Sequence, residues 1–286
     1  MSSSAQILKL RDGRILGYAE YGDPRGKPLF YFHGWPSSRL NAEIYDSHAK
    51  RLHIRIIAPD RPGFGISEYK KDRTLLDWPD DVVALADSLG VRKFAIVGVS
   101  GGGPYAAACA YRIPRYLSHV GIVVGLGPTW VPGNLEGVVW IGRIGWKNFK
   151  FRVVRKISAM IQQFNAYYIY PFGLNRFLFS AKADRRIYQD AYLRKRLVSW
   201  MREAFRHGYR GPEQDLKLYT EPWKFQLRNI RIPVYLWYGA DDRNVSLNMG
   251  NYYASQIQRS TLTIYPGEGH MVFMTHSQEI LKILSS

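Results

Sequence analysis

Short apolar runs alternate with amphipathic stretches along most of the chain. The runs are rich in β-branched and aromatic residues, as buried strands are. They are Leu29–Phe32, Ile54–Ala58, Phe94–Val97, Ile122–Val124, Val234–Tyr238 and Leu262–Tyr265. Apolar residues with helical spacing separate most of these runs, at Leu75–Leu89, Pro104–Tyr111 and Leu247–Gln258. The alternation predicts an α/β fold, with a mostly parallel twisted sheet of about eight strands and helices on both faces.

One long segment interrupts this alternation. Residues 128–231 show helical periodicity and no convincing strand. We therefore expect a core formed by residues 1–127 and 232–286, and a helical cap insertion, residues 128–231, over the strand ends. Near the N-terminus, the alternating apolar positions of residues 5–22 predict an antiparallel hairpin.

Charge is distributed unevenly between these parts. The chain has 40 Lys and Arg against 23 Asp and Glu, a net charge of +17. Residues 128–231 hold 20 of the basic and seven of the acidic residues, an excess of 13, together with the aromatic clusters Tyr167–Phe172 and Phe177–Phe179. Three interpretations remain open: a lid whose charges face water, contact with an anionic membrane surface or amphiphilic substrate, or recognition of an anionic substrate. No nucleic-acid-binding motif accompanies the charge, so we expect no nucleic-acid partner.

The remaining composition is that of a globular protein. No stretch of 18 or more apolar residues occurs, and the N-terminus lacks the basic and apolar regions of a secretory signal. These features predict a cytoplasmic protein, with peripheral membrane contact as the alternative. The single cysteine, Cys109, is expected to be a small buried side chain.

Ser100 is the strongest candidate for chemistry. It lies at the centre of the G-x-S-x-G pattern Gly98–Gly102, between a predicted strand and an Ala-rich predicted helix. A serine on such a turn has its hydroxyl exposed, and the flanking glycines let the two arms of the turn approach each other. A plain tight turn is the alternative.

A serine nucleophile needs a base and an acid that orients the base. His270 lies in a glycine-flanked loop after the last predicted strand, on the same sheet edge as Ser100. Asp241 and Asp242 follow the preceding predicted strand, and the residues alone do not separate them. The oxyanion would need two N–H donors, for which we select Gly101, after the nucleophile, and Trp35, in the loop after the first inner strand.

With these residues in place, the chain resembles the α/β-hydrolase family, in its branch with a serine nucleophile that includes carboxylesterases. The matching segments are His33–Pro36, Asp60–Gly65, Gly98–Gly102, Gly239–Asp242 and Gly269–His270. The resemblance implies that Asp242 is the acid, that Asp60–Gly63 is a structural loop near the site and that residues 128–231 are the variable cap.

The resemblance also implies a function. We expect a serine hydrolase that cleaves carboxylic ester bonds through an acyl-enzyme, with a small hydrophobic or amphiphilic ester under the cap and no metal or organic cofactor. Epoxide hydrolases and haloalkane dehalogenases have an aspartate where this chain has Ser100, which argues against both. A thioesterase, a C–C bond hydrolase, an aminopeptidase, a cofactor-free haloperoxidase and a non-hydrolytic ligand-binding member remain as alternatives. The sequence does not indicate the oligomeric state.

Overall fold

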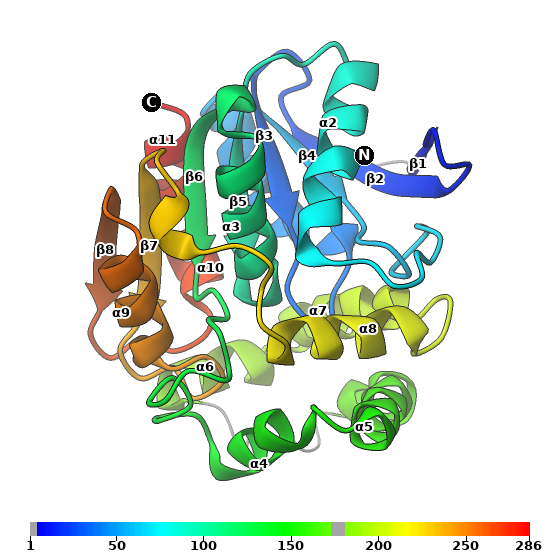
Figure 1. Cartoon of the computed structure of the whole chain (residues 1–286), viewed down its shortest axis with the longest axis vertical. Helices are drawn as coiled ribbons and strands as arrows, with labels where there is room; N and C mark the ends of the chain where they lie inside the picture. Colours follow the sequence, from blue (N-terminus) through cyan, green and yellow to red (C-terminus); the bar gives the residue numbers. More distant parts are fainter. Residues whose placement is uncertain (1–4, 173–180) are drawn as a thin grey trace.

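An eight-stranded sheet forms the centre of the computed structural model, which describes residues 5–172 and 181–286 (Figure 1). In spatial order the strands are β1 (Gln6–Lys9), β2 (Ile15–Gly22), β4 (Ile54–Pro59), β3 (Lys27–Phe32), β5 (Phe94–Val99), β6 (Leu117–Val123), β7 (Val234–Gly239) and β8 (Ser260–Tyr265). The hairpin of β1 and β2 and the pairing of β2 with β4 are antiparallel, and all other pairs are parallel. The mostly parallel α/β sheet predicted from the sequence is confirmed.

The strand bounds differ from the expectation most at β6. This strand begins five residues before the apolar run, at Leu117, which pairs with Phe94 of β5. Ser118 and His119 lie at a register irregularity between this pair and the next, and they are less buried than the rest of the strand. Val124, at the end of the predicted run, lies beyond the strand and has a positive φ of 42°.

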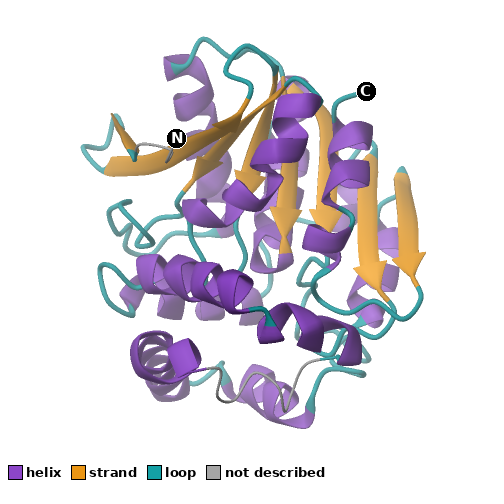
Figure 2. Cartoon of the chain, turned by 180° about the vertical axis from the view of Figure 1, so that it is seen from behind, coloured by secondary structure: helices purple, strands orange, loops and turns teal. Residues whose placement is uncertain are grey.

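Helices cover both faces of the sheet (Figure 1, Figure 2). Those on one face are α2 (Trp78–Ser88), α3 (Gly103–Arg112) and α9 (Leu247–Gln256), and those on the other are α1 (Asp46–Arg51), α10 (Val272–Thr275) and α11 (Ser277–Leu284). Short 3-10 segments occur at Arg39–Tyr45, Leu75–Asp77, Ser100–Gly102, Pro114–Tyr116, Tyr170–Phe172 and Leu227–Asn229, and a π-helical segment at Asn165–Ile169.

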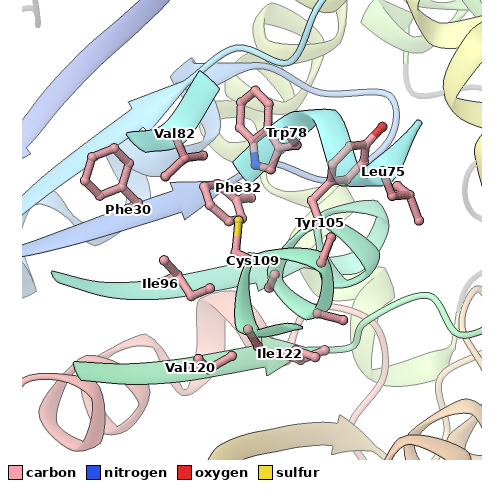
Figure 3. Packing of buried hydrophobic residues seen from close by; sticks show 14 of the residues in the cluster. Phe30, Phe32, Leu75, Trp78, Val82, Ile96, Tyr105, Cys109, Val120 and Ile122 are labelled. Carbon is pink, nitrogen blue, oxygen red and sulfur yellow. The ribbon is translucent and has the colours of Figure 1, made fainter. Parts of the chain in front are cut away.

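Alternate residues of the inner strands face opposite cores. Phe30 and Phe32 of β3 pack with Trp78 of α2 on one face, whereas Leu29 and Tyr31 pack on the other (Figure 3). This two-sided burial explains why the inner strands appear in the sequence as continuous apolar runs. Figure 3 also shows Cys109 of α3 inside the first core; it is buried as expected, and burial raises the pKa of its thiol.

In the described part of the segment between β6 and β7, five α-helices lie across the carboxyl ends of the strands (Figure 1). They are α4 (Trp140–Asn148), α5 (Arg152–Phe164), α6 (Lys182–Gln189), α7 (Ala191–Ala204) and α8 (Arg210–Thr220). No strand occurs in the described part of this insertion, and Phe177–Phe179 lie outside the described residues. Within residues 5–172 and 181–286, no helix has the length and apolar character needed to cross a membrane.

The helices α7 and α8 lie next to the core, and α4 and α5 form the layer farthest from the sheet (Figure 1, Figure 2). Glu203 of α7 is tied to the core by an ion pair with Arg39, whose guanidinium also bonds to the buried Asp60 at 2.7 Å. The insertion is therefore fastened over the sheet edge by its inner helices.

Candidate active site

Ser100 lies where β5 ends and the short 3-10 segment before α3 begins. Its φ of 52° is in the left-handed region, which is strained for a residue with a side chain. A Cβ on Gly98 would lie 2.3 Å from the Gly102 carbonyl oxygen, and a Cβ on Gly102 would lie 2.2 Å from the Phe32 carbonyl oxygen. The glycine spacing in the motif therefore reflects close backbone contacts on both sides of Ser100.

His270 and Asp242 reach the same point from the loops after β8 and β7. The His270 Nε2 is 3.1 Å from the Ser100 Oγ, and its Nδ1 is 2.7 Å from the Asp242 Oδ2. Asp242 is buried, and its Oδ1 accepts backbone N–H groups from Asn244 and Val245 at 2.8 and 3.1 Å. Thus the structure brings together the three side chains selected from the sequence.

The two adjacent aspartates have different environments. The Asp241 side chain is exposed, whereas the Asp242 carboxylate faces the imidazole. An Nδ1–H donated to Asp242 leaves Nε2 unprotonated, facing the Ser100 hydroxyl, which is the tautomer that a general base requires.

The two expected oxyanion donors lie side by side. A Cβ on Gly101 would be 3.2 Å from the Trp35 backbone nitrogen, and a Cβ on Gly34 would be 3.9 Å from the Ser100 Oγ. Among the described residues, none accepts a hydrogen bond from the N–H of Trp35 or of Gly101. Both groups are therefore available to an oxygen next to Ser100. Gly34 does not have a positive φ, so it provides space beside Ser100 rather than an unusual backbone conformation.

Hydrogen bonds to its carbonyl group fix the orientation of the peptide that carries the Trp35 N–H. Its carbonyl, Gly34 C=O, accepts hydrogen bonds from the His33 Nδ1 at 2.9 Å and from the Arg61 guanidinium at 3.0 Å. In a trans peptide the C=O and N–H point in opposite directions, so these donors direct the N–H away from themselves and polarise it. Burial, followed by the charge of Arg61, lowers the pKa of His33 well below its ordinary value, so this imidazole is neutral.

The peptide that carries the Gly101 N–H is also oriented by hydrogen bonds to its carbonyl group. The carbonyl of its peptide, Ser100 C=O, accepts N–H groups from Leu126, at 2.9 Å, and from Gly103. Each proposed oxyanion donor thus belongs to a peptide whose carbonyl is already hydrogen-bonded on the far side.

A buried ionic network connects this backbone to α8. Asp215 of α8 accepts hydrogen bonds from Arg61, at 2.9 Å, from Arg73, and from the Tyr105 hydroxyl, at 2.5 Å. The Tyr219 hydroxyl, one turn later, lies 2.8 Å from the Asp215 Oδ2 and 2.9 Å from the Gly101 carbonyl oxygen. Both Asp215 and Tyr219 are fully buried. An insertion helix therefore bonds directly to the turn that carries Ser100.

A second insertion carboxylate holds the His270 loop. The Oδ2 and Oδ1 of Asp184, in α6, accept the backbone N–H groups of His270 and Met271 at 2.9 and 3.1 Å. Burial raises the pKa of Asp184, and these N–H donors offset part of that shift. No pattern in the sequence indicates a role for Asp184, Asp215, Tyr219 or Arg73, and Arg61 is expected from the sequence only as part of a structural loop. Across the described residues, no group of three or more His, Cys, Asp or Glu is arranged to hold a metal ion.

Comparison with known proteins identifies the family of the chain. A family model described as the alpha/beta hydrolase fold matches residues 27–277. A bifunctional esterase/perhydrolase of Acinetobacter calcoaceticus is 24% identical over 278 residues, covering 96% of each chain, and a non-heme haloperoxidase of Rhodococcus erythropolis is 24% identical over 265 residues, covering 91% of this chain and 90% of the relative. Among solved structures, an esterase from Exiguobacterium antarcticum superposes with a TM-score of 0.71 at 16% identity, covering 98% of this chain and 97% of the esterase. The chain belongs to the alpha/beta hydrolase fold family.

Proposed function

We propose that the protein is a serine hydrolase that cleaves carboxylic ester bonds through an acyl-enzyme intermediate. The observation that carries this proposal is the continuous chain of hydrogen bonds from the Ser100 Oγ through the His270 imidazole to the buried Asp242 carboxylate. Membership of a family with esterase relatives is consistent with it.

In the acylation step, His270 Nε2 takes the hydroxyl proton of Ser100 as the Oγ attacks the ester carbonyl carbon. The carbonyl oxygen gains negative charge and is held by the N–H groups of Gly101 and Trp35, a contribution typically of about 3–4 kcal/mol for each donor. Asp242 stabilises the imidazolium through its Nδ1–H. Collapse of the intermediate expels the alcohol, which leaves with the proton from His270.

In the deacylation step, water takes the place of the alcohol. His270 removes a proton from the water as its oxygen attacks the acyl carbon, and then returns that proton to the Ser100 Oγ as the ester bond to the enzyme breaks. When the acid product leaves, Ser100 and His270 have returned to their starting states. The cycle therefore needs no reactant besides the ester and water.

The first test is the Ser100→Ala substitution. We expect hydrolysis of p-nitrophenyl acyl esters to fall by at least about a thousandfold, because the nucleophile is removed while the fold is kept. A fluorophosphonate probe should label the unsubstituted protein at Ser100 and leave the variant unlabelled. Ser255→Ala, a change at an exposed serine of α9, is the matched control and should keep both properties. Normal turnover by Ser100→Ala would refute the proposal.

The bond type is tested separately with the intact protein. Acyl esters of increasing chain length, acyl-CoA thioesters and amino-acid amides should be compared by kcat/KM. The proposal expects the esters to be turned over fastest. A probe-reactive Ser100 together with preferential cleavage of thioesters or amides would keep the nucleophile and replace the substrate class.

A further inference from the structure

The helix α5 has its apolar side on the outside. Its inner stripe, which packs on α8, contains the buried Arg155 and Ala159, and Arg155 is paired with Glu213 of α8 at 2.8 Å. Its outer stripe is apolar and consists of Val153, Ile157, Met160, Ile161 and Phe164, which follow the helical spacing of one face. A helix on the surface of a globular protein normally shows the reverse arrangement.

The exposed apolar surface is concentrated on α4, α5 and the turn after α5. Of the 17 large hydrophobic side chains exposed in the described part of the chain, 11 lie between residues 140 and 168. They include Val153, exposed by 68%, and two aromatic residues of amphipathic character, Trp140 and Tyr168, exposed by 63% and 62%. Isolated exposed apolar residues are ordinary, but a gathering of this size marks an interaction surface.

The charges of the segment that forms this surface have one sign. Residues 137–183 contain eight Lys and Arg and no Asp or Glu. Lys147 of α4 and Lys156 of α5 are exposed, and Arg152 and Lys156 lie along one edge of the outer stripe of α5. Basic residues beside apolar and aromatic ones match the boundary between the anionic headgroups and the acyl chains of a bilayer.

We propose that α4 and α5 form a docking surface for an anionic lipid bilayer. We call the exposed apolar and basic side chains of residues 140–168 the lipid face. Both views place these helices in the outermost layer, on the far side of α7 and α8 from the sheet (Figure 1, Figure 2). Docking there would set the insertion on the membrane, with the site of Ser100 beneath it.

A second copy of the chain fits this face less well. A symmetric dimer through the lipid face would bring two positively charged surfaces together without a carboxylate on either, since none occurs in residues 137–183. Phosphate headgroups supply the missing negative charge, and the acyl region receives the apolar side chains.

The test measures sedimentation of the full chain with phosphatidylcholine vesicles that contain or lack phosphatidylglycerol, at low and high salt. Binding is expected with phosphatidylglycerol and should weaken as salt screens the lysines. Ile157→Asp combined with Ile161→Asp should reduce the partition coefficient by at least about tenfold, because it removes buried apolar area and adds negative charge. Lys147→Glu combined with Lys156→Glu should reduce it by at least a similar factor, since each lost positive charge is worth about fivefold.

Matched controls separate the lipid face from net charge and general exposure. Lys9→Glu combined with Lys282→Glu changes the net charge equally, at exposed positions of β1 and α11 on the opposite side of the molecule (Figure 1). Ile7→Asp changes an apolar residue of β1 that is 63% exposed. These control variants should bind almost as the unsubstituted protein does. Thermal unfolding and turnover of a soluble ester verify that all variants are folded.

Three results would overturn the proposal. They are absence of binding to phosphatidylglycerol vesicles, equal loss of binding in the face and control variants, and self-association that the face variants abolish without any vesicle binding. Because binding is measured without turnover, and is expected also of Ser100→Ala, failure of docking and failure of the hydrolase assignment can be told apart.

Discussion

At the scale of single residues, the carboxylate of Asp184 has an unusual position. It belongs to the insertion, is 1% exposed, and uses both oxygens to hold consecutive N–H groups of the loop that carries His270. A general base must remain within hydrogen-bond reach of its nucleophile, so the backbone of this loop determines the distance between His270 and Ser100. Asp184 is therefore a positioning residue for the proposed base.

We predict a graded effect of substitution at Asp184. Asp184→Ala leaves one buried and one partly buried N–H group without partners and should lower the stability by about 1–3 kcal/mol. It should also lower kcat by about tenfold or more with little change in KM, because His270 is displaced. Asp184→Asn keeps one acceptor oxygen, so its kcat and its stability should lie between those of the unsubstituted protein and those of Asp184→Ala.

The matched control for this series is Asp241→Ala, which removes an exposed carboxylate next to Asp242. It should leave kcat and the unfolding temperature almost unchanged. Steady-state kinetics on a soluble ester and thermal unfolding provide the measurements. A normal kcat in Asp184→Ala would show that the loop keeps its geometry without this carboxylate.

At the scale of elements, hydrophobic periodicity and residue spacing predict most strands and helices of the core. The inner strands, α2, α3, α9 and the turn at Ser100 follow from apolar runs, helical spacing and glycines, and each lies close to its expected position except for the start of β6. The role of α8 was not predicted, since Asp215 and Tyr219 contact groups more than 100 residues away in the chain. Such pairings depend on how an insertion lies on the core, which no local pattern specifies.

We expect the contact between α8 and the nucleophile turn to affect the chemical step. Tyr219→Phe removes the hydroxyl next to Gly101 C=O and should lower kcat about two- to tenfold, the value of one hydrogen bond, with KM little changed. Tyr31→Phe removes another buried hydroxyl, one bonded to Asn41, from a position away from Ser100. Both variants should lose similar stability, but only Tyr219→Phe should lose turnover; equal kcat in the two would assign Tyr219 to stability alone.

At the scale of the whole molecule, three of the seven acidic residues of the insertion hold it on the core. Asp184, Glu203 and Asp215 all face inward and bond to the core. Most of the described basic residues of the insertion are exposed instead, so the insertion has an inner side that is bonded to the core and a largely basic outer side. The sequence predicted the excess of charge but not its separation into two sides, because that depends on which side chains meet the core.

The inner side makes the stability sensitive to acid. Burial alone would raise the pKa of Asp215, but the charges of Arg61 and Arg73 outweigh this effect and the pKa lies below its ordinary value of 3.8. A carboxylate with a depressed pKa in the folded state contributes stability at pH values above its ordinary pKa and loses it as the pH falls through the folded value. Protonation of Asp215 should therefore weaken the attachment of the insertion to the core and lower the free energy of unfolding.

Asp215→Asn tests this directly. At neutral pH it leaves two buried arginines without a counter-charge and should cost about 3–5 kcal/mol. As the pH is lowered through 3.8 and then through the still lower pKa of folded Asp215, the unsubstituted protein loses the same ion pairs, so the gap between the two unfolding temperatures should narrow. Asp72→Asn, at a carboxylate whose side chain is 79% exposed, should follow the unsubstituted curve throughout. A gap that stays constant or widens in acid would mean that Asp215 stabilises the fold by packing and neutral hydrogen bonds rather than by its charge.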